Sequence, residues 1–398
     1  MRISTAFRYD ESVDNLQRRQ RDMSEAQDAM TNGKRINKPS DDPTGAARAE
    51  RAFIAQQRID SEQRLVDASR NSLQLAESTL GHAVQLLQTA RDTVVVAGNG
   101  SFTAAERQSQ ADQLKHLRSQ LMSLANQDDG AGGYVFGGQS GHTQPFIDTP
   151  NGVVANATPG QQQLSRRETM PTTLDGGAVW LQAATGNGVF VTEAAAGNGG
   201  NAWVTPGTVS DPSALTSGHY ELTFAVSPLG TTYSITKDGA PTSATGMPYR
   251  PTGAIEVDGM SFNISGEPAD GDVFTVDPST NTLDPFAAID RAISVLGNPT
   301  ARPGEVTQAV NTGIRDLDSV LRQFMGARSA AGANMNRLDQ ADSRNQDRLL
   351  WAQTLQSETE DIDMVAAVSD FQAKQTSYSA ALQSYALVQR MSLLDYMK

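Results

Sequence analysis

Few side chains in this sequence could act as nucleophiles or metal ligands. The chain has no cysteine, which excludes disulfides, thiolate zinc sites, iron–sulfur ligation and thiol nucleophiles. Its four histidines, His82, His116, His142 and His219, do not have the spacing of metal ligands. The stretch Gly138–His142 lacks the G-x-S-x-G spacing of a nucleophile elbow. We therefore interpret it as a loop.

Acidic residues form the remaining candidate clusters. Asp41 and Asp42 are adjacent, and a second acidic group lies between residues 358 and 363. Such carboxylates could attract a hard cation such as calcium, but acids in the first turn of a helix explain them without one. No nucleophile, base and orienting group can be assembled at a plausible spacing. We expect neither an enzyme nor a metal or cofactor site.

Charge and hydropathy exclude further classes of function. The 398 residues carry a formal net charge of −13, which argues against a surface for nucleic acid or anionic lipid. Apolar runs such as Val94–Ala97 fall far short of the ~20 residues that a bilayer requires, so we expect no membrane insertion. The first residues lack the apolar core of a signal peptide. If the chain is secreted, we expect another export route.

Proline divides the chain into three parts. No proline lies between Pro43 and Pro145 or after Pro303, and 15 of the 17 prolines lie in 145–303. Because proline disrupts helix interiors, both ends can form long helices around a turn-rich middle. The fold class that we predict is α+β. A long coiled-coil-like helical rod is made from both termini, and a small antiparallel β domain is inserted in the middle.

Seven-residue repeats support the rod. Large apolar residues recur at Ile59, Val66, Leu73, Leu80, Leu87 and Val94. Mostly small residues follow three positions later, at Glu62, Ser69, Ala76, Ala83, Ala90 and Ala97. Asp42 before Pro43 supplies the N-cap of this helix, and leucines from Leu114 to Leu124 predict a second helix that completes a hairpin. A matching stripe in the other arm comprises Val310, Ile314, Leu317, Leu321 and Phe324.

The middle segment shows the alternation of half-buried strands. Apolar residues alternate with others from Tyr220 to Val226 and from Phe262 to Ile264. Asp-Gly pairs at Asp238 and Asp258 predict hairpin turns with positive φ. Trp180 and Trp203 could stack on sugars, which leaves a glycan-binding module open as a role, although burial in a core is the commoner fate of tryptophan.

Both extreme ends carry amphipathic stripes that are interrupted by glutamine. The N-terminal stripe runs from Tyr9 to Met30 and the C-terminal one from Met364 to Gln389. Neither stripe can be satisfied in isolation, so we infer that the ends find partners in other molecules. The alternatives are that both ends pack back on their own rod, or that the chain is an ordinary helical bundle. The expected assembly residues are Val13, Leu16, Met23, Phe371, Tyr378, Leu382 and Tyr385.

Several motifs resemble the bacterial flagellin superfamily. Gly33–Ala47 is similar to its N-terminal signature, and Gly332–Asp339 with Asp361–Met364 is similar to its C-terminal pattern. The ending Gln375–Met397 resembles that of a subunit at the hook–filament junction more than that of filament flagellin. The resemblance covers about residues 1–150 and 255–398.

The resemblance implies a structural subunit of the bacterial flagellum. Members leave the cell through type III export, and their termini fold on assembly as concentric helices. A junction subunit would form a homo-oligomeric ring that joins hook to filament. Its partners would be a neighbouring hook-associated protein and flagellin, with an export chaperone before secretion. Filament flagellin itself is the close alternative.

We expect five parts along the chain. The two ends, 1–42 and 351–398, would be assembly helices, and 43–150 and 284–350 would be the two halves of the rod. The segment 151–283 would be the outer β domain.

Overall fold

A computed structural model describes residues 2–138, 142–156, 161–165, 168–171, 174–251 and 253–396. Three residues of the predicted loop at Gly138–His142 lie outside these ranges. The chain divides into two compact units. We call residues 1–64 with 340–398 the terminal unit, and residues 65–339 the central unit.

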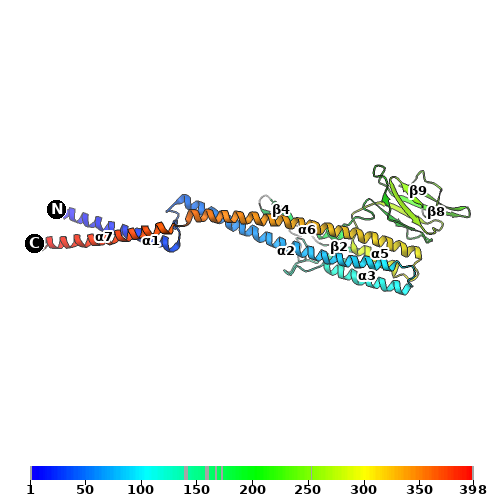
Figure 1. The fold of residues 1–398 in the computed structure, drawn as a ribbon, viewed down its shortest axis with the longest axis horizontal. Helices are drawn as coiled ribbons and strands as arrows, with labels where there is room; N and C mark the ends of the chain where they lie inside the picture. The colour runs from blue at the N-terminus through cyan, green and yellow to red at the C-terminus, as the bar shows by residue number, and fades with distance from the viewer. Residues whose placement is uncertain are drawn as a thin grey trace. The chain divides into compact units, whose positions relative to one another are not determined.

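The described residues form seven helices, and all but α4 lie in the two arms (Figure 1). They are α1 (Arg2–Asn32), α2 (Pro43–Ala97), α3 (Ala104–Ala125), α4 (Gly176–Leu181), α5 (Pro285–Leu296), α6 (Pro303–Glu360) and α7 (Met364–Tyr396). Among the described residues, no helix combines the length and the hydropathy that crossing a membrane would need.

The strands all lie between α3 and α5 in sequence. Two small hairpins come first, β1 (Phe146–Thr149) with β2 (Gly152–Ala155) and β3 (Gln161–Ser165) with β4 (Glu168–Pro171). The others are β5 (Phe190–Ala194), β6 (Trp203–Val204), β7 (Thr208–Val209), β8 (Tyr220–Ser227), β9 (Gly230–Lys237), β10 (Ala240–Pro241), β11 (Met247–Pro248), β12 (Ala254–Val257), β13 (Met260–Ser265) and β14 (Val273–Pro278).

The predicted seam of α2 is the core of the helical part of the central unit. Val66, Leu73, Leu80, Leu87 and Val94 are at most 1% exposed. The small row from Ala76 to Ala97 is fully buried, which lets a partner helix approach closely. On α6 the buried residues include Val310, Leu317, Phe324, Ala331 and Leu338. The expected fold class, a helical rod from both arms with an inserted β domain, is confirmed.

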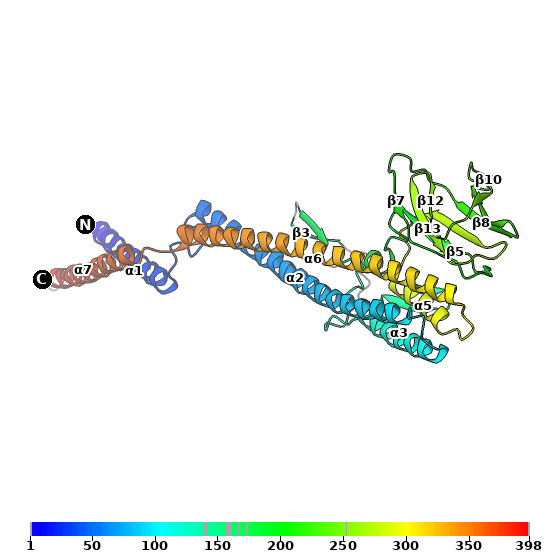
Figure 2. The same ribbon diagram turned by 45° about the vertical axis from the view of Figure 1, so that its right-hand side comes forward.

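Ion pairs fix the register of α2 and α6 as antiparallel neighbours. Arg91 pairs with Asp318 at 2.6 Å, and Arg70 pairs with Asp339 at 3.0 Å. As the residue number rises on α2 it falls on α6, so the two arms run in opposite directions. The views also show α3 lying beside α2, as expected of a helical hairpin (Figures 1 and 2).

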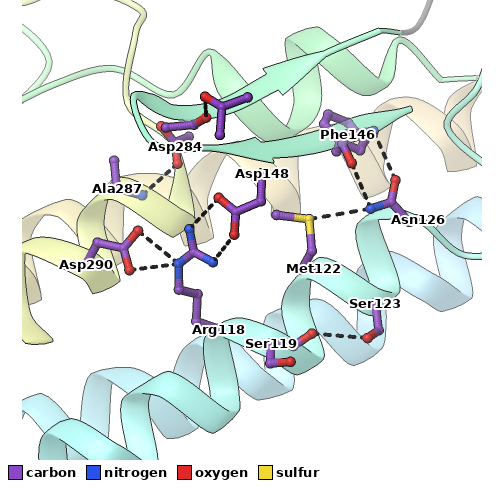
Figure 3. A network of polar contacts seen from close by, with 12 residues as sticks. Arg118, Ser119, Met122, Ser123, Asn126, Phe146, Asp148, Asp284, Ala287 and Asp290 are labelled. Carbon is purple, nitrogen blue, oxygen red and sulfur yellow. Dashed lines mark hydrogen bonds and ion pairs between the residues drawn. The ribbon is translucent and has the colours of Figure 1, made fainter. Parts of the chain in front are cut away.

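Arg118 joins three elements of the central unit (Figure 3). From α3 it donates to both carboxylate oxygens of Asp148 on β1, at 2.6 and 3.0 Å, and its Nε lies 2.7 Å from Asp290 on α5. Hydrogen bonding to Asp148 is the main cause that raises the pKa of Arg118, and the same contact lowers the pKa of Asp148. The side-chain amide of Asn126 donates to the backbone carbonyl of Phe146 and accepts from its backbone amide. These contacts hold the β1–β2 hairpin on α3.

A cluster of aromatic rings lies beneath that hairpin. Trp180 on α4 is fully buried, with its ring centroid 4.8 Å from that of Phe324 and 5.6 Å from that of Phe136. Phe146 and Phe286 complete the cluster. Burial of Trp180 makes it a core residue and removes it from the surface that a sugar could reach. Trp203 is half-buried on β6.

The β domain packs two antiparallel sheets face to face. One sheet has the strand order β10-β9-β8-β14-β5, with β11 also on β9, and the other has β12-β13-β6, with β7 also on β13. Phe224, Phe262 and Phe274 are buried between them. Asp238 and Asp258 have φ of 50° and 44°, so both predicted Asp-Gly turns adopt the expected conformation.

Side chains of α6 hold the β domain through its backbone. Arg315 donates to the carbonyl of Thr192 at 2.9 Å, and Ser319 donates to the carbonyl of Ala184 at 2.6 Å. Gln308 accepts from the amide of Val204 at 2.8 Å. The buried carboxylate of Asp316, 1% exposed, accepts from Arg315 at 2.9 Å. These hydrogen bonds attach the β domain to α6.

His219 should make the stability of the β domain depend on pH. Its Nδ1 lies 2.5 Å from Asp277, and this hydrogen bond raises the histidine pKa above its ordinary value of 6.5. The contact of protonated His219 with Asp277 therefore stabilises the fold fully below pH 6.5. This contribution is lost as the pH rises through the raised pKa of His219 in the folded chain. Because the side chain is half-exposed, we expect an effect below about 1 kcal/mol.

Thermal unfolding across this pH range provides the check. Between about pH 6 and about pH 9 the melting temperature of the β domain should fall more in the wild-type chain than in His219→Gln. His116→Gln, on an exposed face of α3, is the matched control. Identical pH profiles for the wild type and His219→Gln would contradict the assignment.

Candidate assembly interface

The two ends of the chain pair with each other in the terminal unit. Helices α1 and α7 lie side by side in both views (Figures 1 and 2). The hydroxyl of Tyr385 donates a 2.7 Å hydrogen bond to the hydroxyl of Tyr9, and the ring centroids of the two residues are 5.8 Å apart. Further along, Arg19 donates to Ser377. The two helices are therefore antiparallel and pack on one another, an arrangement that differs from the alternative in which both ends pack back on the rod.

Local signals in the sequence set the ends of this helix pair. Gly33 has φ of 68°, the left-handed conformation that commonly terminates a helix, and it follows α1 directly. The carboxylate of Asp363 accepts from the amides of Val365 at 2.9 Å and Ala366 at 3.2 Å, so it caps the start of α7. The predicted cap at Asp42 is confirmed because its carboxylate accepts from the amide of Gly45 at 2.9 Å.

The break between α1 and α2 lies against the break between α6 and α7. Lys34 and Asp361 form an antiparallel bridge. In it the amide of Arg35 donates to the backbone carbonyl of Glu360 at 2.6 Å, and the amide of Ile362 donates to the carbonyl of Gly33 at 3.0 Å. We call these contacts the clasp. Lys34 adds an ion pair to Glu360 at 2.7 Å. Of the acidic group at 358–363, Glu360 and Asp361 thus lie in the clasp and Asp363 caps α7.

The expected assembly residues fall into two groups. Val13, Leu16, Met23, Phe371, Tyr378 and Tyr385 are half-buried, whereas Leu382 is 41% exposed. The helix pair therefore covers part of the stripe in a single chain and leaves part of it in water.

The contact line on α7 is rotated from the predicted stripe. Ala367 is buried, and half-buried residues follow it at steps of four and three, namely Phe371, Lys374, Tyr378, Ala381 and Tyr385. Val368 and Leu382 each follow a contact residue by one position, which places them on one flank of α7. Met364 joins them on that flank, and its side chain is 49% exposed.

The most exposed apolar residues of the pair are ones that sequence reasoning missed. Phe7 is 70% exposed, Val365 is 80% exposed and Leu387 is 62% exposed. We call Met364, Val365, Val368, Leu382 and Leu387 the outer flank. Apolar residues outside a 4–3 stripe could have signalled a second contact face, because one stripe serves one partner helix.

The candidate chemical groups do not converge. Among the described residues, no three histidine, cysteine, aspartate or glutamate side chains lie close enough to hold a metal ion. His82, His116 and His142 are exposed, and His142 contacts the carbonyl of Gly132 at 2.9 Å. Hydrogen bonds from the amides of Lys38 and Asn37 lower the pKa of Asp41. Both members of the Asp41–Asp42 pair thus serve the chain turn before α2.

Comparison with known proteins places these features in one class. Residues 3–141 match the family model for the bacterial flagellin N-terminal helical region. Residues 193–278 match the model for the D2-like domain of flagellar hook-associated protein 1. Paired terminal helices, a helical rod and an inserted β domain thus define a flagellin-like chain, and the resemblance inferred from the motifs is confirmed.

Within this class the similarity to flagellar hook-associated protein 3 extends over the whole chain. The chain is 24% identical to flagellar hook-associated protein 3 of Escherichia coli over all of both chains. The crystal structure of flagellar hook-associated protein 3 from Legionella pneumophila superposes with a TM-score of 0.71 at 27% identity, covering 77% of this chain and 98% of that one. A flagellin of Listeria monocytogenes is 27% identical over only 32% of this chain and 44% of its own. These relatives are flagellar structural proteins, not enzymes.

Proposed function

We propose that this chain is a structural subunit of the bacterial flagellum that joins the hook to the filament. The observation that carries the proposal is the outer flank, which leaves large apolar side chains in water on a chain similar throughout to flagellar hook-associated protein 3. Exposed apolar residues group at two places on α7, at Met364–Val368 and at Leu382 with Leu387, and such groups mark a contact with another molecule. The protein acts outside the cell, at the hook–filament junction.

Assembly proceeds through the terminal helices. Copies form a ring in which neighbouring subunits cover the outer flank, with a hook-associated protein on one side of the ring and flagellin on the other. An export chaperone covers the same helices before secretion. The half-buried residues expected at the interface order α1 against α7, and Leu382 contributes to the intermolecular contact. The five-part division at residues 42, 150, 283 and 350 stays part of this proposal.

Removal of residues 386–398 tests the proposal. The truncated chain should retain the folded central unit, because none of its described contacts involves that segment. It should lose incorporation into the flagellum, because Leu387 and the last turns of α7 are absent. The measurements are the thermal unfolding of the purified chain, its level in the culture medium and its level in isolated flagella.

The level in the medium separates export from assembly. A chain that is secreted but absent from flagella supports the proposal. Normal attachment of filaments in cells that carry only the truncated chain would refute it. Deletion of the exposed tip Pro228–Leu229 in the β domain is a matched control, and this variant should incorporate.

Filament flagellin is the second candidate, since the flagellin family model matches the N-terminal third of the chain. A flagellin polymerises into long filaments when seeded at high concentration, whereas a junction subunit stops at a ring. Electron microscopy of the seeded, purified chain distinguishes the two. We expect no long filaments.

A further inference from the structure

The α2–α6 contact in the terminal unit includes polar side chains beside Ile59 and small buried residues such as Ala52 and Ala352. Gln56 donates to Gln356 at 2.7 Å, and Gln63 donates to Asp342 at 2.7 Å. Asn345 is 7% exposed in the same contact line. We call residues 43–64 of α2 and 340–360 of α6 the terminal layer. Polar side chains in such a seam contribute less than the leucines of the central unit, because burial of apolar surface is the main stabilising force.

Large apolar side chains lie on the outside of the same layer. Phe53 is 42% exposed, Ile54 is 56% exposed, and Leu350 and Trp351 are each 65% exposed. An ordinary helix pair buries its large apolar residues. Here Ile59 is buried, but these four large apolar side chains lie in water. Exposed aromatic residues of this size are typical of the centre of a protein–protein contact.

Helix geometry places the two aromatic residues on opposite sides of the terminal layer. Ala52 and Ala352 are buried and face the partner helix. Phe53 follows Ala52 by one residue and Trp351 precedes Ala352 by one, each a turn of about 100° about its helix axis. Because α2 and α6 are antiparallel, a step forward along α2 and a step backward along α6 rotate toward opposite sides of the helix pair.

Two side-chain contacts between the helices agree with this placement. The Gln56–Gln356 pair lies on the side of Phe53, and the 2.9 Å pair between Arg348 and Glu62 lies on the side of Trp351. We call these the Phe53 side and the Trp351 side.

The two sides carry opposite charge. Helical positions assign five arginines and three carboxylates to the Trp351 side: Arg48, Arg51, Arg58, Arg344, Arg348, Glu62, Asp347 and Glu358. They assign four carboxylates and one arginine to the Phe53 side: Glu50, Asp60, Asp342, Glu360 and Arg64. Of these, Glu360 is paired with Lys34. One basic and one acidic side, each with an aromatic residue, are complementary in charge between copies.

We propose that the Trp351 side of one copy packs on the Phe53 side of a second copy of this chain. This inference rests on the proposed ring and names the surface through which its neighbours meet. The contact is heterologous, since two different surfaces of the same chain meet, and such contacts close into rings when the rotation between copies allows it. Tryptophan and arginine are the residues most enriched in such contacts.

Site-specific cross-linking tests the inference. Because the chain has no cysteine, Phe53→Cys and Trp351→Cys each introduce a single thiol. Both variants are produced together in the parent bacterium without its native copy, and isolated flagella are treated with a short bismaleimide. We expect cross-linked dimers from the mixture and none from either variant alone. Ile54→Cys mixed with Trp351→Cys is the matched control, and we expect no dimers because Ile54 points away from both sides.

The outcomes separate this inference from the proposed function. Complete flagella that contain both variants but yield no dimers overturn the inference and leave the function standing. Dimers from a single variant also overturn it, because they require a symmetric contact. If the wild-type chain itself is absent from flagella, the proposed function has failed instead.

Charge reversal gives a second measurement on exposed residues. Arg51→Glu with Arg58→Glu makes both sides acidic, and Glu50→Lys with Asp60→Lys makes both sides basic. Each double variant alone should incorporate at least about ten-fold less than the wild type, and a mixture of the two should recover within about two-fold. A mixture that incorporates no better than its components overturns the inference.

Discussion

Replacing Val365 by aspartate is expected to abolish incorporation of the chain into flagella while leaving the monomer as stable as the wild type. The side chain is 80% exposed, so the carboxylate stays in water in the free chain. A neighbouring subunit on the outer flank would have to bury that charge without a partner, which costs several kcal/mol. We expect the free energy of association at each subunit contact to weaken by more than about 2 kcal/mol, as is typical when a central interface residue is replaced. Quantitative immunodetection of isolated flagella measures it.

Two further variants show whether the effect is specific to the outer flank. Ala373 is exposed, precedes the contact residue Lys374 by one position and has no neighbour in the outer flank, so Ala373→Asp should incorporate at the wild-type level. Leu16 is half-buried against α7, so Leu16→Asp should also lower the helical circular dichroism of the free monomer. Wild-type incorporation of Val365→Asp would contradict the role of the outer flank.

Replacing Asp316 by alanine should destabilise the central unit by about 3–5 kcal/mol. Its carboxylate accepts from Arg315 at 2.9 Å and from Arg291 at 2.6 Å, and its side chain is 1% exposed. Removal leaves the guanidinium of Arg315, only 6% exposed, without a counter-charge. That guanidinium also holds the carbonyl of Thr192, so the β domain should loosen on α6. Denaturant unfolding of the full chain and protease sensitivity near residue 192 are the measurements.

The other partner of this carboxylate supplies the control. The side chain of Arg291 is 48% exposed, so Arg291→Ala should cost less than about 1 kcal/mol. Joint replacement of Arg315 by Met and Asp316 by Leu should recover most of the loss, because an apolar pair needs no counter-charge. Equal destabilisation by Asp316→Ala and Arg291→Ala would contradict this account.

The rod could be predicted because its signal is repeated. Each heptad from Val66 to Val94 places a large residue beside a small one, and the errors of any single position average out over the repeat. The Asp-Gly turns were predictable for a different reason. Positive φ at Asp238 and Asp258 is a local requirement that few residue pairs meet.

The stripe in the sequence could not predict which face of α7 contacts α1. Phe371, Tyr378 and Tyr385 belong both to the predicted stripe and to the observed contact line, and only the residues between them distinguish the two. Whether Ala367 or Val368 faces α1 depends on how closely the helix axes approach, a property of both helices together. Small residues favour close approach and displace larger ones to the outer flank.

Contacts between segments that are distant in the chain also could not be predicted from the sequence. Arg118 meets Asp148 and Asp290, and Arg315 meets the backbone of Thr192, through folding that brings separate elements together. No local pattern marks these arginines among the others. The same holds for β5, which pairs with β14 although more than seventy residues separate them.

The clasp determines how mechanical twist passes along the terminal unit. A single backbone crossing between two helical segments can swivel about its own φ and ψ angles. Here two crossings, at Lys34 and Asp361, are hydrogen-bonded to each other, so rotation of either one must break the bonds to its neighbour. Torque applied to α1 and α7 is therefore carried into α2 and α6 by both strands of the joint at once.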